Sequence, residues 1–283
     1  MMKQLTKLIF PFTVILCLNS TFGQATKLEA IVEEISKINE VQQERIGYGG
    51  TESENFKNFK KLKSLATTEE LVQLTDHTNA TVACYASWAL ADIAYPDLKS
   101  IFQKFIDHDK QIETFSGCIK SPDFISSELY HWYWNHMELS KRPSDQLLFE
   151  LDSIVLFSTK MNWLLLNRAL ENRVYTEPIK SRIVLLAFEK GNIDAVLYLS
   201  NWHKAEYVDE IKTALLRHLN TNNFKNTGTT DYYRTIEELF KFKDDETRKA
   251  IIAKMKKDRH WEVEKPRFKY LLEDNYIYDI DRE

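Results

Sequence analysis

Aromatic rings and histidines crowd one short stretch of the chain, "ELYHWYWNHMEL" over residues 128–139. Imidazole rings can ligate a metal or move protons, and tyrosine and tryptophan combine a large contact area with a hydrogen-bonding tip. We therefore take this stretch as the candidate binding site. Its candidate residues are His131, Trp132, Tyr133, Trp134 and His136.

The spacing of the two histidines does not fit a metal site. His131 and His136 are five residues apart, which places them about 140° apart around a helix, whereas a helical metal-binding pair needs an i, i+4 spacing. Packing between helices can also explain most of the rings, because one helix face can hold Leu129, Trp132, Tyr133 and His136 and another can hold Trp134. Internal packing and a ligand-facing aromatic patch both stay open, and we assign no metal ligand.

Two cysteines form the second group that could do chemistry. Cys84 and Cys118 are the thiols that remain if the N-terminal segment is removed, and in an oxidising compartment a bridge between them would stabilise the fold by roughly 3–4 kcal/mol. The alternative is a small buried residue at Cys84 and an unrelated loop thiol at Cys118. A catalytic role is disfavoured for Cys84, because an apolar helical environment raises the pKa of a thiol.

Other motifs of enzymes and nucleotide-binding proteins are absent from the sequence. No serine lies in a Gly-x-Ser-x-Gly context, and no glycine-rich loop could cradle a phosphate. Paired acids such as Glu69-Glu70 lie on predicted helices or at their starts, where solvation and the helix dipole account for them. We therefore predict no catalytic residue and no cofactor.

The first residues are typical of a secretory signal peptide. Two lysines precede an apolar run over residues 8–18, which closes in small and polar residues through Gly23. The run is too short to span a bilayer, and Leu16 beside Cys17 stands where a lipoprotein motif needs a small residue. We predict an exported mature chain, periplasmic or secreted, that has no transmembrane segment and no lipid anchor.

The net charge of the chain disfavours one class of binding partner. The formal net charge is −4, and removal of residues 1–23 takes away two lysines and no acids, which makes it −6. Without a basic excess to neutralise phosphates, nucleic acid is not an expected partner.

Helices must position the candidate groups. Seven glycines and six prolines in 283 residues leave few tight turns for a β protein. Apolar residues recur at helical spacing instead, as over residues 28–38. We predict an all-α fold, in which residues 114–130, with Gly117 and Pro122, form an interrupting loop between helices.

The stretch "TNATVACYASWALADI" over residues 78–93 predicts an inner helix. Val82, Ala86 and Leu90 fall on one helix face, and Asn79 stands where an N-cap belongs. The many small side chains let the backbone of this helix approach its neighbours closely. Other predicted helix starts are Thr67 with Glu70 as a capping box, Asp97, Asn192 and Asp244.

This helix and the one before it, "EELVQLTDHTNATVACYASWALADI" over residues 69–93, resemble a HEAT-type repeat. Asn79, Val82 and Ala86 match the family's polar turn, apolar position and small residue. Ala83 departs from it, since the family commonly has arginine after the valine. The resemblance implies an irregular α-α superhelix, or solenoid, of helix pairs, and it implies no activity.

The predicted organisation has four segments. They are a signal peptide over 1–23, an N-terminal helical segment over 24–66, a HEAT-like region over 67–220 and a C-terminal helical segment over 221–283, with a loop from Asn220 to Thr230 at the last boundary.

Two main classes of function remain for such a chain, beside a purely structural role in the cell envelope. The first is an exported, non-enzymatic helical-repeat protein that binds another protein or a peptide through its solenoid surface. The alternative is an enzyme or accessory lyase with an aromatic and histidine pocket around residues 131–136. A histidine that meets a carboxylate in a closed pocket would favour the enzyme, whereas burial of the rings among apolar side chains would disfavour it.

Overall fold

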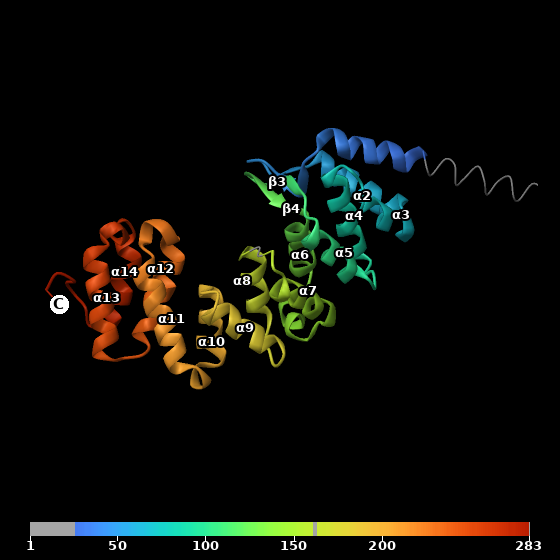
Figure 1. Cartoon of the computed structure of the whole chain (residues 1–283). Coiled ribbons are helices and arrows are strands. Elements are labelled where there is room, and N and C mark those ends of the chain that lie inside the picture. Colours follow the sequence, from blue (N-terminus) through green and yellow to red (C-terminus); the bar gives the residue numbers. More distant parts are fainter. Residues whose placement is uncertain (1–25, 161–162, 283) are drawn as a thin grey trace, which may run out of the picture. The chain divides into compact units, whose positions relative to one another are not determined.

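The computed structural model describes residues 26–160 and 163–282, so the predicted signal peptide over 1–23 lies outside the described residues (Figure 1). Most of the described chain is helical, with a small four-stranded sheet. The all-α prediction is therefore right in the main and wrong for the sheet. The chain divides into two compact units, unit 1 up to Leu165 and unit 2 from Leu166. This division falls inside the region predicted as repeats.

Unit 1 begins with a helix over residues 26–38 and contains all four strands. Its further elements are β1 (Val41–Ile46), β2 (Thr51–Glu52), α2 (Glu54–Leu65), α3 (Thr68–Leu74), α4 (Ala80–Asp92), α5 (Leu98–Asp107), β3 (Gln111–Gly117), β4 (Ile119–Phe124), α6 (Ile125–Asn135), the 3-10 helix η1 (Leu139–Ser144) and α7 (Gln146–Phe157). Helix α8 (Trp163–Asn172) runs across the division between the units.

Helix α4 is the centre of unit 1, as its sequence predicts. The Asn79 side chain accepts hydrogen bonds from the backbone N–H groups of Thr81 (3.0 Å) and Val82 (3.1 Å), which satisfies two donors at the helix start. Every residue from Thr81 to Ala91 is buried, and α4 packs against α2, α3, α5, α6 and the sheet. Small side chains are required here because a helix with neighbours on all sides has little room beside its backbone.

The loop predicted over residues 114–130 is wrong, because this stretch belongs to the sheet and to the start of α6. Its strand order is β2-β1-β3-β4, with β1 and β3 parallel and the other pairs antiparallel. Residues 111–124 form the β3–β4 hairpin, in which Ile112 and Thr114 point inward on alternate positions and Gly117 turns the chain with a φ of +54°. Glycine adopts this conformation without a Cβ clash. The inward positions are too few for their period of two to stand out in the sequence.

A tyrosine ties the sheet to α4. The Tyr85 hydroxyl donates to the Gln42 carbonyl oxygen (3.0 Å) and accepts from the Gln42 N–H (2.7 Å). One buried side chain on α4 therefore satisfies both backbone groups of a residue in β1, which fixes the sheet against the central helix.

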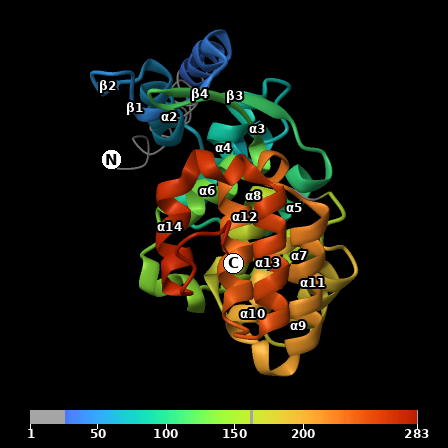
Figure 2. The same ribbon diagram turned by 90° about the vertical axis from the view of Figure 1, so that its left-hand side faces the viewer.

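Unit 2 is a succession of helices. Its elements after α8 are α9 (Ile179–Phe188), α10 (Ile193–Trp202), the 3-10 helix η2 (Lys204–Glu206), α11 (Val208–Thr221), α12 (Phe224–Phe240), α13 (Asp245–Lys257), the 3-10 helix η3 (Arg259–Glu264) and α14 (Lys265–Asp274). From α9 to α13 each helix packs on the next one (Figure 2). Helix α11 also contacts both α9 and α13, and α10 also contacts α12. The caps predicted at Asn192 and Asp244 are confirmed, since their side chains accept from the N–H groups of Ala195 and Thr247.

The predicted loop from Asn220 to Thr230 is wrong. Helix α11 continues to Thr221 and α12 begins at Phe224, whose N–H donates to the Asp258 carboxylate (2.7 Å). Asparagine and threonine are weak helix formers, but Phe224 at the start of α12 packs against Tyr232 and Phe268. Over the described parts of both units, no helix is both long and apolar enough to cross a membrane.

Candidate functional site

Residues 128–135 of the candidate aromatic stretch lie in helix α6 and His136 is its C-cap, and the rings of the stretch divide between the interior and the surface. Trp132 is 7% exposed, and its ring stacks on that of Trp88 from α4, with centroids 4.0 Å apart and an interplanar angle of 12°. The Trp88 ring in turn packs against Tyr85 and Phe59. Packing is predicted to explain most of the rings; Trp132 is buried, whereas Tyr133 and Trp134 are half-buried and His136 is exposed.

Trp132 also joins the interior to the surface through polar contacts. Its Nε1–H donates to Asp92 Oδ1 at the end of α4 (2.7 Å), and Asp92 Oδ2 accepts from Lys63 Nζ (2.6 Å). On the side toward solvent, the His136 ring lies 4.0 Å from the Trp132 ring, and His136 Nδ1 is 2.8 Å from the Trp132 carbonyl oxygen. The indole is therefore held by ring contacts with Trp88 and His136 and by a hydrogen bond from its N–H group to Asp92.

Tyr133 is held by a hydrogen bond to Asp145. Its hydroxyl donates to Asp145 Oδ1 (3.1 Å), the same carboxylate oxygen that accepts from the Leu148 N–H at the start of α7. Burial, followed by the nearby Asp145 charge, raises the pKa of Tyr133 well above its ordinary value. This tyrosine therefore stays protonated and acts as a hydrogen-bond donor.

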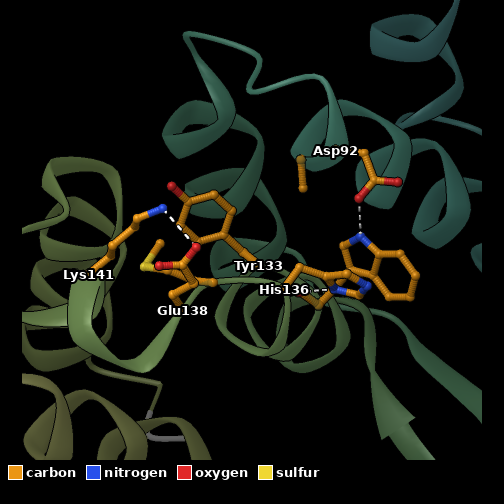
Figure 3. A pocket seen from close by; sticks show the side chains of 8 residues that line it. Asp92, Tyr133, His136, Glu138 and Lys141 are labelled. Atoms are coloured by element: carbon orange, nitrogen blue, oxygen red, sulfur yellow. Dashed lines mark hydrogen bonds and ion pairs between the residues drawn. The ribbon is translucent and has the colours of Figure 1, made fainter.

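These side chains surround a hollow of about 330 Å³, which we call the α4–α6 hollow (Figure 3). In Figure 3, Tyr133, Glu138 and Lys141 lie on one side of it, and Asp92 and His136 on the other. Its walls come from the ends of α4 and α6 and from η1. The full lining is Ala91, Asp92, Trp132, Tyr133, His136, Met137, Glu138 and Lys141.

Three of the five candidate residues line this hollow and two do not. Trp134 is covered by the Arg142 guanidinium, whose Cζ lies 3.4 Å from the ring centroid and whose Nη2 donates to the Trp134 carbonyl oxygen (3.2 Å). His131 lies beside the Tyr130 ring, with centroids 6.2 Å apart. The two histidines are thus placed apart, and no group of three or more potential ligands within the described ranges is arranged to hold a metal.

Several residues that line the hollow could not be predicted as site residues from the sequence. Asp92 contributes through a contact to Trp132 across 40 positions of the chain. Glu138, which directly precedes η1, forms an ion pair of 3.0 Å with Lys141 in η1, a segment with no helical apolar pattern. Only the proximity of Glu138 to the aromatic stretch could have drawn attention to it.

The predicted disulfide is not part of the structure. Cys84 is buried in α4, whereas Cys118 is exposed at the turn between β3 and β4, and both thiols are free. Burial raises the pKa of the Cys84 thiol well above its ordinary value. A thiol in that state is a poor nucleophile and acts as a small apolar side chain.

The geometry of the α4–α6 hollow suits binding better than proton transfer. His136 turns Nδ1 toward a backbone carbonyl oxygen rather than a carboxylate, and the Asp92 carboxylate holds the Trp132 indole and Lys63. No protein-family model matches the chain, and comparison with curated proteins and with solved structures yielded no similar protein. Function must therefore be inferred from the residues themselves.

Proposed function

We propose that this chain is a non-enzymatic binding protein, and that the α4–α6 hollow receives a side chain of a peptide or protein partner. The observation that carries this proposal is that the Trp132 side chain, which lines the hollow, is fixed by its neighbours. Trp132, which lines the hollow, stacks on Trp88, is in tilted contact with the His136 ring and donates a hydrogen bond to Asp92. A surface that is already ordered loses little conformational entropy when a partner binds.

The composition of the rim agrees with peptide recognition. The lining combines the aromatic side chains of Trp132, Tyr133 and His136 with the charged groups of Asp92, Glu138 and Lys141. Tryptophan and tyrosine are among the residues that dominate binding energy in protein interfaces, and the charged groups can select a partner of complementary charge. The hollow has room for one side chain rather than for a large cofactor.

The alternative, an enzyme or accessory lyase, has less support. It needs a histidine and a carboxylate that can exchange a proton with a substrate. His136 and Asp92 do line the same hollow, but each makes a contact that stabilises the fold rather than a contact with the other.

Two further parts of the proposal concern the whole chain. The succession of packed helices in unit 2 supports an α-α superhelix of the repeat type, since each helix contacts its neighbours along the chain. The lysine, apolar and small-residue pattern of residues 1–23 supports export. A partner would then be sought outside the cytoplasm.

Selection from a displayed random dodecapeptide library tests the binding proposal. The purified protein is compared with the double variant His136→Ala, Glu138→Ala, which changes two exposed lining residues. A matched control changes Gln103→Ala and Thr159→Ala in a second hollow of about 430 Å³ between α5 and α7. Retained peptides are expected to bind the double variant about tenfold more weakly, and the control within about twofold of the unchanged protein.

The proposal is wrong if peptides bind the unchanged protein and the double variant equally well. It is also wrong if selection retains no peptide above the background of the double variant. Thermal unfolding of all three proteins, followed by circular dichroism, shows that the variants are folded.

A further inference from the structure

The unit that holds the α4–α6 hollow is strongly acidic. Residues 26–165 contain 21 aspartates and glutamates against 14 lysines and arginines, a net charge of −7, whereas residues 166–283 contain 21 against 22, a net charge of +1. A negative field favours approach of cationic partners and disfavours anionic ones.

Within the hollow, carboxylates stand on two sides. The Asp92 side chain is 15% exposed, and its two oxygens accept one bond each from Trp132 and Lys63. A carboxylate has about four acceptor positions, so Asp92 retains acceptor capacity toward a ligand. Partial burial strengthens its interaction with a cation relative to a fully exposed acid.

The second carboxylate, Glu138, is paired only at the surface. Glu138 and Lys141 are 68% and 66% exposed, and their 3.0 Å contact joins residues three apart on one turn. Exposed pairs of this kind contribute little to stability. A ligand cation can therefore replace Lys141 as the partner of Glu138 at small cost.

The chain itself displays how a ring of α6 holds a cation. The Arg142 guanidinium stacks on Trp134 at 3.4 Å and donates to the carbonyl oxygen of the same residue. A planar guanidinium can use this mode because it stacks on a ring while its edge donates hydrogen bonds, which an ammonium cannot do. His136 and Tyr133 offer rings of the same helix at the hollow.

We propose that the α4–α6 hollow binds an arginine side chain of the peptide partner, with the guanidinium between Asp92 and Glu138 and against the His136 ring. This inference rests on the proposed function and adds the chemistry of the ligand to it. Lysine would be a weaker ligand, because its ammonium lacks the planar stacking surface.

The probes are the dodecapeptides retained in the selection above, each resynthesised with arginine replaced by citrulline, which has the same shape and no charge. Calorimetric titration is expected to show that citrulline weakens binding about tenfold and that Glu138→Gln does the same to the arginine form. Lys141→Ala removes the internal competitor and is expected to tighten binding about threefold.

The outcomes separate the two proposals. Retained peptides without arginine, equal affinity of the arginine and citrulline forms, or weaker binding to Lys141→Ala would overturn the arginine inference while leaving a peptide-binding hollow in place. Absence of any peptide that depends on His136 and Glu138 would overturn the proposed function itself.

Discussion

At the scale of single residues, Trp132 connects the core of unit 1 to its surface. It stacks on Trp88 inside, it meets His136 outside, and its indole N–H donates to Asp92. The ring and the N–H group have separate roles, since the ring fills the core and the N–H group fixes the carboxylate.

Replacement of Trp132 by phenylalanine separates these two roles. Trp132→Phe retains much of the stacked ring and removes the hydrogen bond to Asp92, so the free energy of unfolding is expected to fall by about 1–2 kcal/mol. Urea denaturation followed by circular dichroism at 222 nm measures it. Trp202→Phe is the control, because Trp202 is 52% exposed and its change should stay within about 0.5 kcal/mol. Equal effects of the two changes would show that the Asp92 contact contributes nothing.

A second residue-scale prediction concerns Glu128 at the start of α6. Burial, followed by the nearby Asp123 charge, raises the pKa of Glu128 from 4.5 to about 7. In the unfolded chain this carboxyl loses its proton near pH 4.5, whereas in the folded chain it keeps the proton to about pH 7. Its ionisation therefore lowers stability as pH rises from 4.5 through 7.

Glu128→Gln should relieve that penalty. The variant is expected to be more stable than the unchanged protein by about 1–3 kcal/mol at pH 8, and to differ little from it at pH 4.5, where the carboxyl is protonated in the folded chain and only half ionised in the unfolded chain. Urea denaturation at the two pH values measures the difference, and Glu69→Gln, at an exposed position, is the control. A difference of the same size at both pH values would contradict a raised pKa in the folded chain.

At the scale of elements, helix α4 begins with the cap that the sequence predicts. Asn79→Ala removes an acceptor for two backbone N–H groups and should lower the free energy of unfolding by about 1 kcal/mol. Asp97→Ala is a matched control at the next helix start, because the Asp97 side chain makes no capping hydrogen bond there, and it should cost under about 0.5 kcal/mol. Chemical denaturation of both variants gives the comparison, and a larger loss for Asp97→Ala would contradict this description of the two caps.

The junction of the sheet with α4 makes a second element-scale prediction. Tyr85→Phe leaves both backbone groups of Gln42 without their buried partner, so the expected loss is about 1–3 kcal/mol. Tyr48 is fully exposed, and Tyr48→Phe should leave stability unchanged within about 0.5 kcal/mol. Hydrogen exchange of the β1 amides should also accelerate in Tyr85→Phe and not in Tyr48→Phe. Unchanged protection in both would show that Tyr85 does not fix the sheet.

Helices and strands could be predicted from the sequence where the residues that determine them are close together in the chain. The Asn79 cap and the Thr67–Glu70 capping box depend on residues within four positions of each other, and both are present. The β3–β4 hairpin was missed because β3 depends on pairing with β1, about 70 positions earlier in the chain. The hollow was predicted only in part for the same reason, since Asp92 meets Trp132 across 40 positions.

At the scale of the whole molecule, the two units differ in charge. Because residues 26–165 have a net charge of −7, binding of arginine peptides should weaken as salt rises from ~50 to ~500 mM, where exposed charges are screened. Titration of the arginine and citrulline forms at both salt concentrations measures this. The citrulline form should change much less, and equal salt dependence of the two forms would contradict an electrostatic contribution from the guanidinium.

The central claim is that ligands bind at the α4–α6 hollow, and the indole N–H signals of the six tryptophans test it most directly. The Trp132 signal, assigned with Trp132→Phe, reports on a group at the hollow, whereas Trp202 and Trp261 belong to unit 2. In a nuclear magnetic resonance titration with a retained peptide, we expect the Trp132 signal to shift with the binding curve and the Trp202 and Trp261 signals to stay in place. A binding curve followed by other tryptophans while Trp132 stays unchanged would place the site elsewhere and contradict the account.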